Sequence, residues 1–149
     1  EFQPLPHRLE YIGEFQNIHF YNDSISTIPQ STIAALESLY NVDTLIIGGM
    51  NRGLNYSELF DYLKKSNVKN IFCIGELKDF LFTNLENIKD KNVMKFDDLQ
   101  QAVDAAFRLT SPGKICLLSP AAASYDQFKN FEDRGDKFKY YIKNFDNKI

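Results

Sequence analysis

The sequence is poor in the residues that mark common catalytic and metal sites. Its 149 residues include two cysteines and two histidines. Cys73 and Cys116 each lie inside an apolar run, which is typical of buried thiols in a reducing compartment and argues against a disulfide or a metal site. His7 lies near the N-terminus and His19 in an expected edge strand, so no Ser–His–Asp arrangement is expected.

Nucleotide-binding signatures, long apolar runs and basic tracts are missing too. The chain contains no G-x-x-x-x-G-K-[ST] loop and no G-x-G-x-x-G loop. We therefore expect that the domain by itself catalyses no reaction. No apolar run approaches the ~18 residues of a membrane span, and we expect no signal peptide at the start of this sequence. The formal net charge is -3, without a cluster of lysine and arginine, which argues against nucleic acid as a partner.

What is present predicts a layered α/β domain. Mostly apolar segments at 42–47, 70–74 and 114–118 are typical of parallel strands that are buried on both faces. Segments with helical spacing of apolar residues separate them, which favours a three-layer, Rossmann-like fold with a mostly parallel sheet, an antiparallel edge hairpin and helices on both faces. Strands are expected at 9–14, 18–22, 42–47, 70–74, 93–96 and 114–118, and helices at 29–40, 56–65, 77–85, 98–109 and 126–144.

The two ends of the chain carry further signals. Residues 1–8 contain Pro4 and Pro6 and predict a linker stub, so the domain proper is expected over 9–149. Because the chain begins without an initiator methionine, we expect it to be a fragment of a longer protein. Gly135 interrupts the last expected helix at a cost near ~1 kcal/mol relative to alanine, and close approach of another backbone is the reason we expect for it.

Three polar loops directly follow expected strands, at 22–28, 48–53 and 119–125. The carboxyl ends of parallel strands lie at one edge of a sheet, so these loops are expected to converge. They offer one carboxylate, hydroxyl groups, two helix starts and the guanidinium of Arg52, which can hold a carboxylate by two parallel hydrogen bonds. The pattern indicates a site for an acidic small molecule or a phosphate, and three unrelated surface loops are the competing interpretation.

Several short segments together resemble a known family, the C-terminal domain of the Mur ligases and in particular their glutamate-adding branch. The resemblance covers nearly all of residues 4–145. The segments that carry it are Leu5-Pro6-His7-Arg8, Tyr21-Asn22-Asp23-Ser24, Gly48-Gly49, Ser119-Pro120-Ala121, and Asp126-Gln127-Phe128-Lys129-Asn130-Phe131 with Arg134-Gly135.

The resemblance implies a three-domain cytoplasmic enzyme of peptidoglycan synthesis. Such an enzyme uses ATP and Mg²⁺ to form an acyl phosphate on UDP-N-acetylmuramoyl-L-alanine, and the amine of glutamate then attacks it to give an amide. The N-terminal UDP-binding domain and the central P-loop ATPase domain, which would hold most of the Mg²⁺ ligands, are absent from this chain. The C-terminal domain would close over the central one, with no catalytic residue and no metal ligand of its own.

The resemblance also implies roles for individual residues. Arg8 would contact the ATP phosphates, and Asp23 would contact the ribose of the nucleotide. Phe131 would act through its backbone, since we expect its ring to pack in the core. The positions implied for glutamate binding are Thr27, Arg52, Ser124, Tyr125 and Phe131.

The chain departs from the family pattern at three positions. Ile25 stands where the family usually has a lysine after the Asp-Ser pair, Ile28 precedes Pro29 where an asparagine is usual, and Arg52 replaces the lysine of the glycine loop. A related branch of these ligases adds L-glutamate, and both enantiomers remain open. A folylpolyglutamate synthase-like ligase would share the architecture, and a free-standing anion-binding module would also fit the polar loops.

Overall fold

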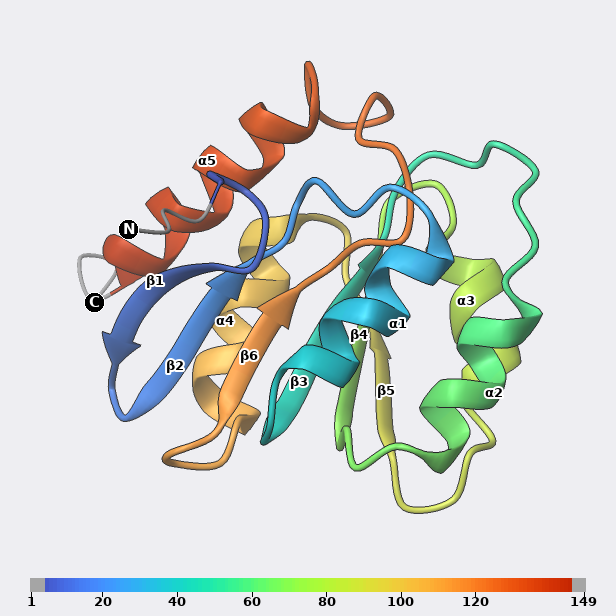
Figure 1. Cartoon of the computed structure of the whole chain (residues 1–149), viewed down its shortest axis with the longest axis horizontal. Coiled ribbons are helices and arrows are strands. Elements are labelled where there is room, and N and C mark those ends of the chain that lie inside the picture. The colour runs from blue at the N-terminus through green and yellow to red at the C-terminus, as the bar shows by residue number, and fades with distance from the viewer. Residues whose placement is uncertain (1–4, 146–149) are drawn as a thin grey trace.

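A six-stranded sheet crosses the molecule in the order β1-β2-β6-β3-β4-β5 (Figure 1). The computed structural model describes residues 5–145. β1 pairs antiparallel with β2, and every other neighbouring pair is parallel, which confirms the predicted mostly parallel sheet with an antiparallel edge. The strands are β1 (Glu10–Phe15), β2 (Ile18–Asn22), β3 (Val42–Gly48), β4 (Asn70–Ile74), β5 (Asn92–Lys95) and β6 (Ile115–Leu118).

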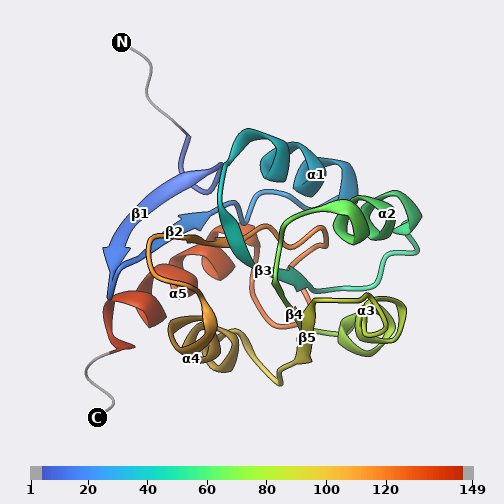
Figure 2. The ribbon, with the colours of Figure 1, turned by 90° about the horizontal axis from the view of Figure 1, so that it is seen from below.

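Helices cover both faces of the sheet, as predicted (Figure 2). Alternate side chains of each buried strand enter opposite layers: Leu45 and Ile47 of β3 pack towards α1, α2 and α3, whereas Ile46 packs towards α4 and α5. This alternation explains why β3 is apolar along most of its length. The helices are α1 (Pro29–Ser38), α2 (Ser57–Lys65), α3 (Lys78–Leu85), α4 (Leu99–Leu109) and α5 (Phe131–Lys143).

Local sequence signals account for the starts of two helices. Pro29 occupies the first turn of α1, where its missing N–H costs little. The carboxylate of Asp98 accepts a hydrogen bond from the backbone N–H of Gln101 at 2.9 Å and caps α4. Within residues 5–145, no helix has the length and apolar character that a membrane crossing needs.

The start of the last helix differs from the expectation. α5 begins at Phe131, where the side chain of Asn130 accepts a hydrogen bond from the N–H of Asp133 at 2.7 Å. Residues 119–130 form a loop rather than a tight turn into a helix at Asp126. The reason is that Asn130 has an extended backbone, with a φ of −166° and a ψ of −178°, which a helix continuing from Asp126 does not allow, while the Asp126 carboxylate bonds to the N–H of Glu76.

The two cysteines and His19 lie in inner strands. Cys73 of β4 and Cys116 of β6 are free and buried on opposite faces of the sheet. Burial raises the pKa of Cys73 to about 12 and raises the pKa of Cys116 as well, so both thiols are core groups. His19 was expected in an edge strand, but β2 pairs with β6 as well as β1, and the imidazole Nδ1 shares a hydrogen bond with the hydroxyl of Tyr11 at 2.8 Å.

Candidate functional site

The candidate site lies at the carboxyl edge of the sheet, where three loops leave neighbouring strands. β2, β6 and β3 are adjacent in the sheet although they are far apart in sequence. Their loops are the β2 loop (23–28), the β6 loop (119–130) and the β3 loop (49–56). The order of the strands therefore places the β6 loop between the other two.

Backbone hydrogen bonds join these three loops. The N–H of Ala121 in the β6 loop donates to the carbonyl of Ser26 in the β2 loop at 3.0 Å. The N–H of Met50 in the β3 loop donates to the carbonyl of Ala123 at 2.8 Å. The predicted convergence is thus confirmed, and it depends on main-chain contacts that need small residues in the β6 loop.

A fourth loop, which follows β4, also reaches this edge, and the sequence analysis missed it. The N–H of Glu76 donates to the carboxylate of Asp126 in the β6 loop at 2.9 Å. The Glu76 carboxylate in turn accepts a hydrogen bond from the N–H of Asn51 at 2.7 Å. The signal that could have found this loop is Gly75, which directly follows the strand and has a φ of 75°.

Arg134 on α5 joins the β2 and β6 loops through hydrogen bonds of its side chain. Its side chain is 1% exposed, and its guanidinium donates to the hydroxyl of Ser24 at 2.9 Å, to the carbonyl of Ser24 at 2.7 Å and to the carbonyl of Ala122 at 2.9 Å. Burial lowers the pKa of Arg134 to about 10, which still leaves it charged near neutral pH. The sequence analysis quoted Arg134 within a motif but assigned it no role.

The structure brings together several positions implied for glutamate binding. The guanidinium carbon of Arg52 lies 5.9 Å from the centre of the Tyr125 ring, although the two residues come from different loops. Both side chains are exposed, and the neighbouring Ser124 is buried. Thr27 lies half-buried in the β2 loop.

Phe131 is held through its backbone. Its carbonyl accepts a hydrogen bond from the hydroxyl of Ser24 at 2.7 Å, and Ser24 is the residue that also contacts Arg134. The ring was expected in the core, but it is half-buried outside both core clusters and packs edge-on against the imidazole of His7, with 6.0 Å between ring centres. The backbone of Phe131 is therefore part of the same network as the β2 loop.

The two positions implied for the nucleotide also share a hollow. Arg8 and Asp23 line a depression of about 250 Å³ beside α1. The Asp23 carboxylate accepts hydrogen bonds from the Leu9 N–H at 3.0 Å and from the hydroxyls of Ser26 and Ser119 at 2.5 and 2.7 Å. Burial raises the pKa of Asp23 despite these bonds and the nearby charge of Arg8. Asp23 thus also holds the chain around Arg8.

Metal-binding side chains do not gather here. Among residues 5–145, no group of three His, Cys, Asp or Glu side chains is placed to hold a metal ion. The edge carries guanidinium groups and hydroxyls, and the carboxylates of Asp23, Glu76 and Asp126 that also lie there each accept hydrogen bonds from the protein.

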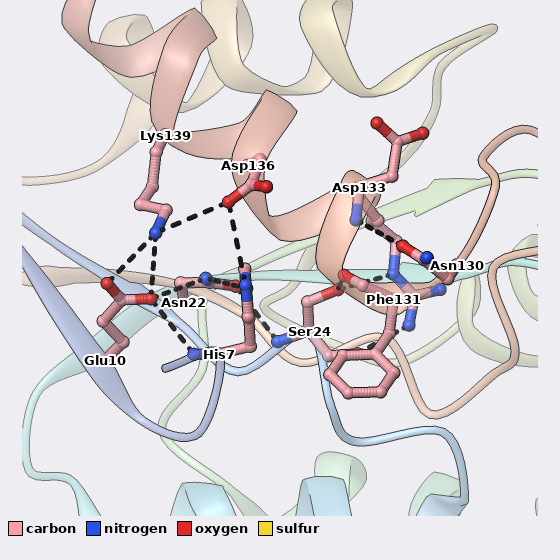
Figure 3. A network of polar contacts seen from close by, with 10 residues as sticks. His7, Glu10, Asn22, Ser24, Asn130, Phe131, Asp133, Asp136 and Lys139 are labelled. Atoms are coloured by element: carbon pink, nitrogen blue, oxygen red, sulfur yellow. Dashed lines mark hydrogen bonds and ion pairs between the residues drawn. The ribbon is translucent and has the colours of Figure 1, made fainter. Parts of the chain in front are cut away.

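The segment that was expected to be a linker stub is anchored where the structure describes it. Residues 1–4 of that stub lie outside the described part. His7 is 7% exposed, and its N–H donates to the carboxylate of Glu10 at 3.1 Å (Figure 3). Glu10 also accepts from the side chains of Asn22 at 3.0 Å and Lys139 at 3.1 Å.

Glu10 should give the domain part of its pH dependence. Burial acts to raise the pKa of Glu10, but hydrogen bonds from His7, Lys139 and Asn22 outweigh it and hold the pKa below the usual 4.5. Its stabilising contribution is therefore full above that value and is lost as the pH falls through the folded-state pKa. We expect Glu10→Gln to lower the free energy of unfolding near pH 7 by less than ~1 kcal/mol after solvent screening, and by clearly less at about pH 3.

Urea unfolding at the two pH values would measure this difference. Glu14→Gln is the matched control, because Glu14 is exposed on the same strand. An equal loss for Glu10→Gln at both pH values would show that hydrogen-bond geometry, rather than charge, is what Glu10 supplies.

The fold and the site together define a mostly parallel α/β domain in which four loops meet at the carboxyl edge of the sheet. The sequence model described as "Mur ligase, glutamate ligase domain" matches residues 7–122, more than half of the chain. The chain therefore belongs to this family.

Curated relatives extend the similarity to almost the whole chain. A UDP-N-acetylmuramoylalanine--D-glutamate ligase from Geotalea uraniireducens is 40% identical over 145 residues, which are 97% of this chain and 31% of that protein. A ligase of the same name from Fervidobacterium nodosum is 37% identical over 143 residues, 96% of this chain and 34% of its own length. The chain thus spans about a third of the length of these relatives.

Solved structures share the fold at low identity. The MurF ligase of Thermotoga maritima in complex with ADP has a TM-score of 0.59 at 17% identity, covering 97% of this chain and 33% of that one. FolC of E. coli in complex with DHPP and ADP has a TM-score of 0.62 at 19% identity, covering 97% and 32%. A domain of a putative ligase from Haemophilus ducreyi has a TM-score of 0.60 at 18% identity, covering 91% of this chain and 99% of that one.

Proposed function

We propose that this chain is the glutamate- and nucleotide-contacting domain of a larger cytoplasmic, ATP-dependent ligase of peptidoglycan synthesis. The ligase joins D-glutamate to UDP-N-acetylmuramoyl-L-alanine. The observation that carries the proposal is the meeting of Arg52, Tyr125 and Ser124 at one sheet edge, in a chain 40% identical to a D-glutamate ligase. A carboxylate-bearing substrate fits these groups.

In this reaction the carboxylate of UDP-N-acetylmuramoyl-L-alanine takes the terminal phosphoryl group of ATP, which gives an acyl phosphate and ADP. The amine of glutamate then attacks the acyl carbon, phosphate leaves, and an amide is formed. Mg²⁺ would supply charge neutralisation for the phosphates from ligands in the rest of the protein. The work of the present chain is to bind and orient both the nucleotide and the amino acid.

The β3 and β6 loops would bind the glutamate. Arg52 is exposed and lies against the Tyr125 ring, which limits the directions its guanidinium can take. It can hold one carboxylate by two parallel hydrogen bonds. The buried guanidinium of Arg134 donates to the neutral acceptors of Ser24 and Ala122, so its charge adds a fixed positive potential at the same edge.

The hollow beside α1 would bind the nucleotide. Arg8 provides a guanidinium for the phosphates, and Asp23 a carboxylate for the ribose hydroxyls. The three hydrogen bonds that Asp23 already accepts fix the position of its oxygens, and about one lone pair, on Oδ1, remains for a ligand.

Arg52→Ala tests the proposal on the full-length protein. A hydrogen bond to a charged group contributes about 1.5–3 kcal/mol, so the KM for glutamate is expected to rise about 10- to 100-fold while the KM for ATP stays within about twofold. ADP release would be followed while one substrate is varied at a time. Arg108→Ala is the control, because Arg108 is exposed in the last turn of α4, whose end leads to the opposite sheet edge. An unchanged glutamate KM would remove Arg52 from the site.

The enantiomer is tested by the same assay with D-glutamate and L-glutamate in parallel. We propose D-glutamate because the curated relatives carry that name. Turnover with L-glutamate alone would place the inverted selectivity in the altered β2 loop, with Ile25, and in Arg52. Turnover with neither would favour another acceptor or a non-catalytic anion-binding module.

A further inference from the structure

The imidazole of His7 is closely surrounded by side chains of β2 and α5. Its Nδ1 lies 2.9 Å from the side-chain nitrogen of Asn22, and its Nε2 lies 3.7 Å from the carboxylate of Asp136 (Figure 3). The ring of Phe131 closes one side edge-on. A residue in a segment with linker composition is thus enclosed by β2 and α5.

The neighbours of His7 also select one form of its ring. The side-chain oxygen of Asn22 accepts a hydrogen bond from the N–H of Ser24 at 3.1 Å, and this fixes which end of the amide faces His7. The Asn22 nitrogen then donates both to Glu10 and to Nδ1 of His7. Nδ1 is therefore the acceptor, and the proton is on Nε2, on the side of Asp136.

Gly135 of α5 lies directly against the imidazole of His7. A Cβ at position 135 would lie 2.1 Å from Nδ1 of His7 and 2.8 Å from the side-chain nitrogen of Asn22. The close approach that the sequence analysis expected is therefore made by side chains and not by another backbone. The fit explains why a glycine is placed inside α5 despite a cost of about 1 kcal/mol to the helix.

The backbone on either side of Arg8 is strained. His7 has a φ of 67° and Leu9 a φ of 44°, which costs about 1–2 kcal/mol for each non-glycine residue. The N–H of Ile25 donates to the carbonyl of His7 at 3.1 Å, and the N–H of Leu9 donates to Asp23. These contacts hold a turn that places Arg8 on the wall of the hollow it shares with Asp23.

We infer that His7 is a positioning residue: its imidazole, seated against Gly135, holds the strained turn that presents Arg8 to the nucleotide phosphates. The inference rests on the proposed function for the role of Arg8. It adds that the N-terminal part of α5 serves both ligands. Arg134 holds the β6 loop, which contacts the glutamate, together with the β2 loop, and the adjacent Gly135 supports the segment of Arg8, which contacts the nucleotide.

His7→Ala in the full-length protein is the first test. We expect the KM for ATP to rise about tenfold and the KM for glutamate to stay within about twofold, because only the turn around Arg8 is released. Hydrogen exchange of the Leu9 and Ile25 amides should become faster, since both bond within this turn. His19→Ala is the matched control, and it should change neither the KM for ATP nor these exchange rates.

Two further variants separate positioning from a general loss of folding. His7→Asn should restore part of the ATP affinity, because asparagine tolerates a positive φ and its oxygen can accept from Asn22. Gly135→Ala should raise the KM for ATP by displacing the imidazole, and it should raise it by a smaller factor in the His7→Ala background, where only the contact of the new Cβ with the side chain of Asn22 remains. Independent effects of the two substitutions would overturn the inference.

Arg8→Ala distinguishes failure of this inference from failure of the proposed function. A raised ATP KM for Arg8→Ala beside an unchanged one for His7→Ala would overturn the positioning role alone. An unchanged ATP KM for Arg8→Ala would overturn the nucleotide role of Arg8 in the proposed function, and the positioning role with it. Unchanged exchange of the Leu9 and Ile25 amides in His7→Ala would overturn the inference whatever the kinetics show.

Discussion

Replacing Arg134 with methionine is expected to destabilise the domain by about 3 kcal/mol. Methionine fills a similar volume but donates no hydrogen bond, so the carbonyls of Ser24 and Ala122 lose their charged partner. Each such bond contributes about 1.5–3 kcal/mol, and removal of the buried charge recovers part of its desolvation cost. The lost bonds outweigh this gain because the acceptors stay buried on two loops that Arg134 joins to α5.

Urea unfolding of the 149-residue chain measures this loss. Arg108→Met is the matched control, because Arg108 is exposed at the end of α4 and should change stability by no more than about 0.5 kcal/mol. Arg134→Lys should also be strongly destabilised, since an ammonium group cannot reach the three acceptors in the directions of the planar guanidinium. A loss below about 1 kcal/mol for Arg134→Met would mean that the loops are held chiefly by their own backbone bonds.

Gly48→Ala is expected to have the second large effect, a loss of about 4 kcal/mol or failure to accumulate as soluble protein. Gly48 ends β3 with a φ of 120°, and a Cβ there would lie 2.1 Å from the carbonyl oxygen of Ile74 on the adjacent strand. Neither backbone can shift without breaking the parallel pairing of β3 with β4. The substitution therefore combines conformational strain with a clash between the ends of two central strands.

Gly53→Ala separates these two causes. Gly53 lies in the β3 loop with a φ of 71°, and a Cβ there would meet nothing within 4 Å. Its replacement should cost about 1 kcal/mol, the conformational cost alone. Yields and urea midpoints of the two variants would be compared. Equal losses would show that close strand approach is not what requires glycine at position 48.

The sequence by itself determined the class of fold and the place of the site. Mostly apolar segments such as 42–47 and 70–74 indicated strands buried on both faces, because successive side chains of a strand point to opposite faces of the sheet. Their polar residues Asp43, Thr44 and Asn70 are buried as well and are hydrogen-bonded. Parallel pairing then placed the loops after β2, β3 and β6 at one edge. These features follow from local hydrophobic pattern and chain geometry, which a single sequence contains.

Only the tertiary structure decided how the loops are held. Ser24 and Arg134 bond across 110 positions of the chain, and Asn22 of β2 contacts His7, which lies in a segment whose composition indicated a linker. The start of α5 shifted from Asp126 to Phe131 because Asn130 is extended and caps the helix, while Asp126 bonds to Glu76 in the loop after β4, a contact that no helical pattern records. The packing of the His7 imidazole against Gly135 likewise joins two parts of the chain that are far apart in the sequence. Such contacts are set by long-range packing, so local pattern could place the site but not its supports.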